Sequence, residues 1–217
     1  WGFYDETADK RYQTEYGRPI ADHGMTLAPG DAVFVDLNGD GVLNGDDATR
    51  DIGFTDIPEY TAGLNLGFSW KNFDFSMQWT GAWNVDRMLS EFRRPLGDTN
   101  SKALLLYQYE TTWRSSEDTF TAKFPRASNS HASNNYRGTD LYLINASYLR
   151  LKNVEIGYNF DFPFMKKMKL DNCRLYINGY NLLTITGFDW GDPESRQSDR
   201  PNYPLTRVFN IGLKVGF

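Results

Sequence analysis

The sequence predicts an all-β fold, an antiparallel sheet of long strands of the kind that builds transmembrane β-barrels, and three observations lead to it. Several segments alternate between apolar residues and small or polar ones, which gives a strand one apolar and one polar face. These segments approach the length of about 9–11 residues that a tilted strand needs to cross a bilayer. Short turns and long loops alternate between them, as in outer-membrane barrels.

The first two strands form a predicted hairpin. Residues 62–70 place Ala, Leu, Leu, Phe and Trp on one face and Gly, Asn, Gly and Ser on the other. Lys71 and Asn72 form a short turn, and residues 73–81 then alternate Phe, Phe, Met and Trp against Asp, Ser, Gln and Thr. Because both faces keep their character beyond the ~5–6 residues of an average strand, the pattern favours long membrane-crossing strands.

Three further strands are predicted at 148–160, 174–184 and 206–217. In the first of them the apolar positions are odd at Leu149 and Leu151 and even from Val154 onward, so the sequence predicts a β-bulge near Lys152-Asn153. The connections at 71–72 and 161–172 are short, whereas those at 82–147 and 185–205 are long and polar. Within the longer loop, Lys102–Thr112 is predicted to form a short surface helix.

The last strand ends on an aromatic residue, Phe217. Taken alone, this strand fits the half-buried strand of a soluble sheet equally well. Five strands are too few to close a membrane barrel, which needs about eight, and open sheet edges are not viable in lipid. We therefore expect the chain to be part of a larger barrel, with residues 1–61 as an extracellular loop region and residues 62–217 as C-terminal strands and loops.

Composition narrows the possible functions. Hydrophobic residues make up 40% of the 217-residue chain and mean hydropathy is -0.57, so no apolar run reaches the ~18 residues of a membrane helix. Aromatic residues make up 16%, which suits a barrel with aromatic girdles and also a carbohydrate-binding sandwich. The net charge of -5 argues against a nucleic-acid partner, and no residue spacing selects catalytic acids, so we do not expect an enzyme.

Residues 36–47 match the twelve-residue calcium loop. Oxygen-bearing side chains occupy its first, third and fifth positions, a glycine follows at the sixth, and an acid ends it, although with Asp in place of the usual Glu. The predicted ligands of one structural calcium ion are Asp36, Asn38, Asp40, the carbonyl of Val42, and Asp47. The alternative is a turn rich in Asp, Asn and Gly without a metal.

Four blocks of sequence carry a resemblance to a known family. They are Pro29–Asp36 with the Asn-Gly-Asp-Gly loop, Ser147–Tyr158, Asn181–Thr184 with Asp192-Pro193-Glu194, and Tyr203–Arg207 before Phe217. In this order the chain resembles the C-terminal part of the SusC/RagA family of TonB-dependent outer-membrane transporters. The Ser-Tyr-Leu-Arg-Leu-Lys-Asn run at 147–153 is the most specific of these motifs.

The resemblance implies a Gram-negative outer-membrane barrel of about 22 strands that encloses an N-terminal plug, of which this chain would supply the last five or so strands. It also implies a SusD-like surface lipoprotein over the barrel mouth, energy from the TonB complex through the N-terminal part, and import of oligosaccharides or peptides. The transporter and lipoprotein could assemble as a dimer of pairs. Since the chain starts at Trp1, we expect it to be a fragment.

A different class of protein remains as the alternative. A secreted, calcium-stabilised β-sandwich could bind carbohydrate through exposed tryptophans, and Trp83, Trp113 and Trp190 are the candidates. The same three residues are the candidate substrate contacts if the chain belongs to an importer. The uneven loops and the terminal Phe217 favour the barrel.

Overall fold

The computed structural model describes residues 1–89, 106–161, 163, 170–195 and 205–217. Its contacts divide the chain into two compact units, which are described separately. The loop unit contains Trp1–Gly53 and Met88–Leu143, and the sheet unit contains Phe54–Arg87 and Ile144–Phe217. The sequence predicted a boundary between the extracellular loop region and the barrel section at residue 61. These contacts do not test that boundary, so it stays a prediction.

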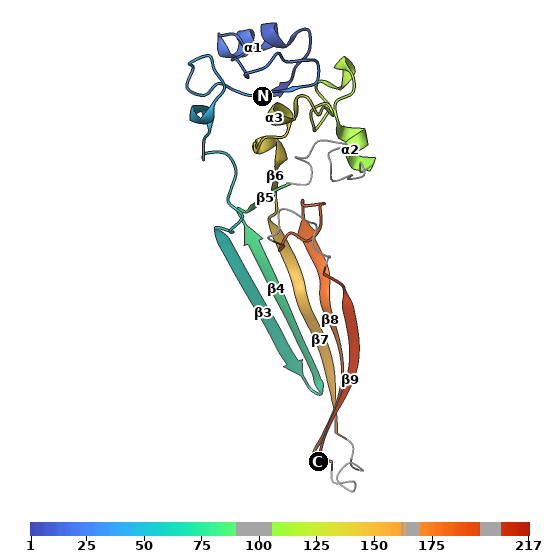
Figure 1. The fold of residues 1–217 in the computed structure, drawn as a ribbon. Coiled ribbons are helices and arrows are strands. Elements are labelled where there is room, and N and C mark those ends of the chain that lie inside the picture. Colours follow the sequence, from blue (N-terminus) through green and yellow to red (C-terminus); the bar gives the residue numbers. More distant parts are fainter. Residues whose placement is uncertain (90–105, 162, 164–169, 196–204) are drawn as a thin grey trace. The chain divides into compact units, whose positions relative to one another are not determined.

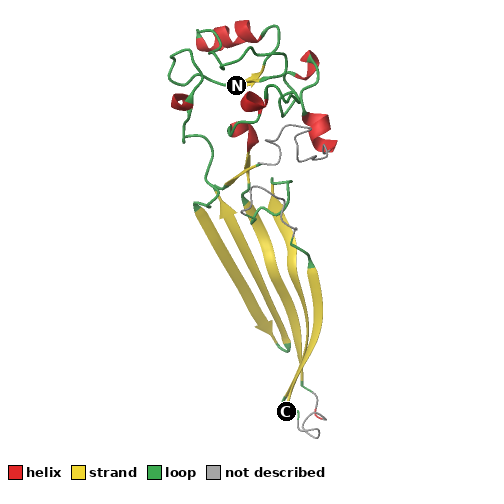
Figure 2. Ribbon diagram, viewed as in Figure 1, coloured by secondary structure: helices red, strands yellow, loops and turns green. Residues whose placement is uncertain are grey.

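The sheet unit is one antiparallel sheet of five strands in the order β3-β4-β7-β8-β9 (Figure 1). Its strands are longer than the average strand of about 5–6 residues, and they run as uninterrupted arrows side by side (Figure 2). They are β3 (Tyr60–Trp70), β4 (Phe73–Trp83), β7 (Tyr148–Phe160), β8 (Asn172–Thr186) and β9 (Val208–Gly216). All five strands predicted from the alternation are therefore present.

The predicted bulge is confirmed. Asn153 pairs with Gln78 on one side, and Leu151 pairs with the next residue, Trp79, so Lys152 has no partner in β4. The register between β7 and β8 shifts at the same place. This extra residue brings Leu149 and Leu151 back to the face that carries Val154, which explains why the apolar positions change from odd to even along one strand.

The turns at one end of the sheet are short. Lys71, with φ at 55°, and Asn72 connect the paired residues Trp70 and Phe73, as expected for a tight hairpin. Phe160 pairs with Cys173 at this same end. All longer connections leave the opposite end, so the predicted asymmetry of turns and loops is present in the structure.

The loop unit is built from short elements. The structure describes β1 (Gly2–Phe3), α1 (Ala8–Tyr16), β2 (Ala32–Val33), η1 (Gly45–Asp47), α2 (Leu106–Thr111), η3 (Ser116–Asp118), α3 (Ala132–Asn135) and η4 (Asp140–Tyr142). β1 pairs with β2, and β5 (Asp86–Met88) pairs with β6 (Leu143–Asn145). None of the helices in the described ranges is long and apolar enough to span a membrane.

A small core holds the loop unit together. Tyr12, Val33 and Tyr142 are essentially fully buried, and the rings of Phe124 and Tyr142 stack with their centroids 5.8 Å apart. α1 ends at Gly17, whose left-handed φ of 71° is typical of a helix terminus. The helix predicted at 102–112 corresponds to α2, and residues 102–105 lie outside the described residues.

Candidate functional site: a sheet with an apolar and a polar face

One face of the sheet is apolar across all five strands. Directly paired residues share a face, so rows of partners can be followed from β3 to β9. One complete row is Phe68, Phe75, Ile156, Ile177 and Ile211. Four of these five side chains are exposed, and Ile211 is exposed to 72%. A soluble monomer rarely leaves so large an apolar surface in water.

Aromatic residues mark both ends of this face. Tyr60 pairs with Trp83 at the loop end, and Trp70, Phe73 and Tyr158 form a row at the turn end. Rings at two levels with aliphatic residues between them are the pattern of a wall that meets both interfaces of a bilayer. The observed register puts the apolar residues of the alternating segments on this one side, among them Leu64, Leu66, Phe68, Phe75, Met77, Ile211, Leu213 and Val215.

The opposite face carries a connected polar network. Arg174 on β8 donates to both carboxylate oxygens of Asp74 on β4, and its Nη2 lies 2.7 Å from Oε1 of Glu155 on β7. Asn178 donates to Glu155 over 3.3 Å and accepts from Asn210 over 2.9 Å. The network thus joins four neighbouring strands and lets one guanidinium pair with two carboxylates.

A glycine makes the longest reach of this network possible. Gly157 on β7 lies between β4 and β8, where it pairs with Asp74 on one side and with Tyr176 on the other. The guanidinium of Arg174 occupies the space that a side chain at position 157 would need. The absence of a Cβ therefore lets Arg174 cross one strand and bind Asp74 two strands away.

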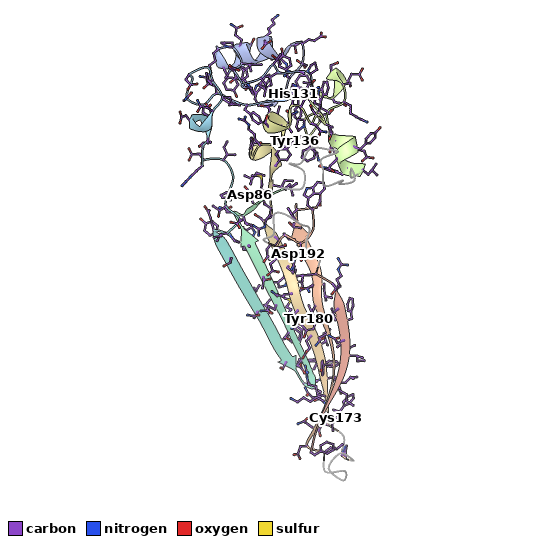
Figure 3. The ribbon with its side chains drawn as sticks, in the orientation of Figure 1. Asp86, His131, Tyr136, Cys173, Tyr180 and Asp192 are labelled. Atoms are coloured by element: carbon purple, nitrogen blue, oxygen red, sulfur yellow. The ribbon has the colours of Figure 1, made fainter. Side chains whose placement is uncertain are left out.

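The most specific sequence motif has a structural role that the sequence did not reveal. Arg150, in the Ser-Tyr-Leu-Arg-Leu-Lys-Asn run, is only 2% exposed and binds Asp192 and Glu194, each over 2.8 Å. Its Nε also donates to Oγ1 of Thr184 over 3.1 Å. Asp192 belongs to the loop after β8 and lies at the opposite end of the sheet from Cys173 (Figure 3). Two of the sequence blocks are thus bound to each other.

The Pro29-Gly30-Asp31 block is buried in the loop unit. The carboxylate of Asp31 has no exposed surface and accepts from Arg126 over 2.7 Å and from Asn135 over 2.9 Å, while His131 Nδ1 lies 2.6 Å away. Burial alone would raise the pKa of Asp31, but the hydrogen bonds from Arg126, the Ala28 N–H and Asn135 outweigh it and lower that pKa. Gly30 packs so closely against Trp113 that a Cβ would collide with the indole.

The calcium-type loop has the turns expected from its sequence. Asp36 is 1% exposed and accepts from the N–H groups of Gly39 (2.6 Å) and Gly41 (3.0 Å). Asp47 reaches back to the backbone N–H of Leu37 over 2.8 Å, and Asp40 accepts from Val42 over 2.8 Å. The hydrogen bond from the Asn44 backbone N–H is the main reason why the pKa of Asp47 is lowered, and the N–H groups of Leu37 and Asn38 lower it further. The loop is therefore closed on itself by its own carboxylates.

The fit of this loop to a metal ion is partial. Among the described residues no three His, Cys, Asp or Glu side chains converge on a common metal position. Nη1 of Arg18 lies 3.9 Å from Oδ2 of Asp36, and a second nitrogen of that guanidinium donates to the Asp36 carbonyl. Backbone donors and Arg18 thus already compensate the buried carboxylate. Oxygen atoms of the right kind are present, but several bind N–H groups.

The candidate tryptophans have different surroundings. Trp113 is 9% exposed and its indole N–H donates to Thr119 over 3.3 Å, so in this structure it packs in the core of the loop unit. Trp83 is 38% exposed at the end of β4, and Trp190 is half-buried in the loop after β8. Their role as substrate contacts stays a prediction, and the surroundings of Trp113 favour packing.

The sheet does not fit the alternative fold. In a β-sandwich one face of each sheet is covered by a second sheet, whereas every residue of β3 is exposed and no second long-stranded sheet occurs among the described residues. An exposed apolar face combined with an ion-paired polar face is instead what a wall between lipid and an interior compartment requires.

Comparisons with known proteins agree with this geometry. No protein-family model matches the chain. TonB-dependent receptor P3 of Formosa agariphila is 31% identical over 206 residues, which cover 87% of this chain and 19% of the relative. TonB-dependent receptor SusC of Bacteroides thetaiotaomicron is 25% identical over 205 residues, covering 94% of this chain and 18% of the relative. The chain thus spans about a fifth of these relatives' length.

Solved structures show the same fold. The RagAB peptide importer in the 'closed-closed' state superposes with a TM-score of 0.64 over 85% of this chain and 20% of that chain, at 24% identity. The 'open-open' state gives a TM-score of 0.62 over 82% of this chain and 19% of that chain, at 23% identity. The chain is therefore a segment of a TonB-dependent receptor, a class found in the outer membrane of Gram-negative bacteria.

Within this class the relatives with curated names include SusC, and the structural neighbours are RagAB. These comparisons support the assignment to the SusC/RagA family that the four sequence blocks indicated. Its relatives are receptors and transporters, which is consistent with the expectation that the chain is not an enzyme.

Proposed function

We propose that this chain forms a section of the barrel wall of a TonB-dependent importer, with the apolar face of the sheet in contact with lipid and the polar face toward the barrel interior. The observation that carries the proposal is the continuous row of exposed apolar residues across five strands, opposite the Arg174 network. In this arrangement β3 and β9 continue the sheet by pairing with strands outside the chain, in a barrel of about 22 strands.

The wall section can be tested in the full-length protein with single cysteines introduced after Cys173, the free cysteine of this chain, has been replaced by Ala. Leu66→Cys places a thiol on the apolar face, whereas Asn65→Cys places one on the polar face of the same strand. A lipid-soluble maleimide should label position 66 in membranes, and position 65 should react with it at least ~10-fold more slowly. Equal labelling of both positions by the lipid-soluble reagent would show that the sheet is not a lipid-facing wall.

The proposed orientation places the turn at Lys71-Asn72 in the periplasm. The loop unit and the segment 187–195 then lie on the cell surface, together with the predicted extracellular region 1–61. A protease added to intact cells should cut only on the surface side. Cleavage at residues 71–72 in intact cells would reverse the orientation.

The proposed importer works with partners that the chain does not contain. A SusD-like surface lipoprotein would close the barrel mouth, a plug would fill the interior, and the TonB complex would supply energy through the N-terminal part. The pair could further assemble as a dimer. Support comes from the solved structure of the RagAB peptide transporter, whose fold this chain shares, and from the relatives that are named TonB-dependent receptors. Co-purification of a lipoprotein with the tagged full-length transporter is the direct measurement.

The proposed cargo is an oligosaccharide or a peptide. RagAB is described as a peptide transporter, and both classes of substrate were implied by the family resemblance. Trp190 offers aromatic surface for stacking on sugar rings or apolar side chains, whereas Trp83 lies on the apolar face. Uptake of labelled peptides and labelled oligosaccharides by cells with and without the transporter would separate the two classes.

We also propose that the loop 36–47 binds a structural calcium ion through Asp36, Asn38, Asp40, the Val42 carbonyl and Asp47. Support comes from the sequence pattern and from carboxylates already drawn into the loop. Binding would require Arg18 to move away from Asp36, so Arg18→Gln should tighten calcium binding. In calorimetry Asp40→Ala should abolish the binding heat, and the control Asp46→Ala should not. The absence of any heat in the unmodified protein would make the loop a polar turn.

A further inference from the structure

Two buried arginines meet the same short segment after β8. Arg150 on β7 binds the side chains of Asp192 and Glu194. Arg87 in β5 is 6% exposed and donates from Nε to the Ser195 carbonyl over 2.8 Å and from Nη2 to the Pro193 carbonyl over 3.3 Å. One guanidinium therefore holds the carboxylates of the segment 192–195, and the other holds its backbone.

Arg87 also reaches the connection before β3. Its Nη1 donates to the Asp56 carbonyl over 2.7 Å, and the neighbouring Asp86 accepts from the Phe54 N–H over 2.7 Å. Thr184, at the end of β8, accepts from Arg150. The two arginines thus join segments that are more than a hundred residues apart in the sequence, all at the loop end of the sheet and all within the sheet unit.

The segment 187–195 is only partly buried. Phe188 is buried, but Gly187, Asp189, Gly191 and Glu194 are exposed. Glu194 is 40% exposed, whereas the Asp192 side chain is 8% exposed, so the Arg150–Asp192 bond is the better shielded ion pair. Buried charge-assisted bonds with two partners are stronger and more directional than surface pairs, which contribute little.

We propose that Arg87 and Arg150 form a guanidinium clamp that fixes the segment 187–195, with Trp190, as an immobile part of the barrel rim. Removing Arg150 would leave Asp192 buried without its cation, and removing Arg87 would take away the donor that it supplies to the Pro193 and Ser195 carbonyls; both losses favour release of the segment. The clamp makes Arg150 and Arg87 positioning residues for whatever Trp190 contacts. This proposal rests on the proposed function only for its location at the rim.

The test uses the full-length transporter purified in detergent, with chymotrypsin as the probe of Phe188 and Trp190. Arg150→Met should raise the cleavage rate in 187–195 at least ~10-fold, and Asp192→Asn should raise it by a smaller factor, because Arg150 keeps its bonds to Glu194 and Thr184. The double variant should cleave no faster than Arg150→Met, because Arg150→Met already removes the bond to Asp192. Lys152→Met is the matched control: it removes an exposed charge from the same strand, 3.6 Å from Glu194, and should leave the rate unchanged.

Three results would overturn the clamp: an unchanged rate in Arg150→Met, multiplication of the two single effects in the double variant, or an equal rise in Lys152→Met. Retained resistance of the barrel to SDS at room temperature shows that each variant is folded, and Arg150→Lys, which keeps the charge but loses the fork of donors, should restore resistance only in part. If Arg150→Met does not fold, Asp192→Asn alone still decides the outcome. If chymotrypsin cut the segment 187–195 in whole cells only after the outer membrane had been permeabilised, the proposed orientation would be reversed. The comparison of variants in detergent would still be valid.

Discussion

A charge placed on the apolar face of β3 should destabilise the protein far more than the same charge on the polar face. Leu66, in β3, pairs with Met77 on the apolar side, and its neighbour Asn65 pairs with Gln78 on the polar side. Leu66→Arg and Asn65→Arg therefore introduce one guanidinium each at nearly the same height of the wall. They differ only in the face on which it stands.

The size of the effect follows from the depth of Leu66. It stands six positions after Tyr60 and four positions before Trp70, the aromatic residues at the two ends of the strand. At ~3.3 Å per residue and a tilt of ~40°, Leu66 lies about 15 Å from one aromatic level and about 10 Å from the other, within an apolar band of about 25 Å. Arginine near the bilayer midplane costs about 2–4 kcal/mol, which is roughly a 30- to 1,000-fold change in the unfolding equilibrium.

The assay is denaturant unfolding of the full-length protein in lipid vesicles, followed by loss of the folded band in unheated gels. Leu66→Arg should lower the unfolding free energy by about 2–4 kcal/mol, and Asn65→Arg by less than about 1 kcal/mol. Leu66→Gln is the control for lost packing, since it removes apolar contact without adding a charge. Equal losses at positions 65 and 66 would refute the assignment of the faces.

Other predictions follow from the polar network and the loop unit. Arg174→Met should lower the unfolding free energy by about 1–3 kcal/mol, because Asp74 loses its charged donor. Gly157→Ala should lower it by part of that amount, because the new methyl group displaces the same guanidinium. If Gly157→Ala were as stable as the unmodified protein, Arg174 would not cross β7 in the way described. His23 accepts from the Phe34 N–H over 3.2 Å, and its pKa is lowered, chiefly by burial. The stability that neutral His23 contributes is therefore fully present above the unfolded pKa of about 6.5, and it is lost as the pH falls below that value. Hydrogen exchange at Phe34 should accelerate in that pH range, and His23→Gln should remove the pH dependence; unchanged exchange between pH 7 and 5 would show that His23 is not the titrating group.

Much of the sheet could be predicted because its signal is local. Alternation with a period of two identifies each strand, and the change of parity between Leu151 and Val154 identifies the bulge, since both depend only on neighbouring residues. The calcium-type loop is equally local, and its turns form as the spacing of Asp36, Asn38 and Asp40 indicates.

The loop unit and the clamp could not be predicted in the same way. Asp31 meets Asn135 across 104 positions, and Arg87 meets Ser195 across 108. No periodic pattern links side chains at such separations, and the short elements around them have too few residues to show a period. The sequence identified Asp31, Arg150 and Asp192 only as members of characteristic blocks, and their partners became visible only in the fold.

The bulge at Lys152 has a consequence for the evolution of this wall. Deleting that one residue would restore an unbroken alternation in β7 and would leave Leu149 and Leu151 on the apolar face, because Asn153–Gln78 and Leu151–Trp79 are already successive pairs. Inserting one residue into the regular part of the strand, for example between Val154 and Ile156, would instead turn one half of the strand over. Among related genes, changes of length within this strand should therefore be confined to the neighbourhood of position 152, and all others should collect in the loops.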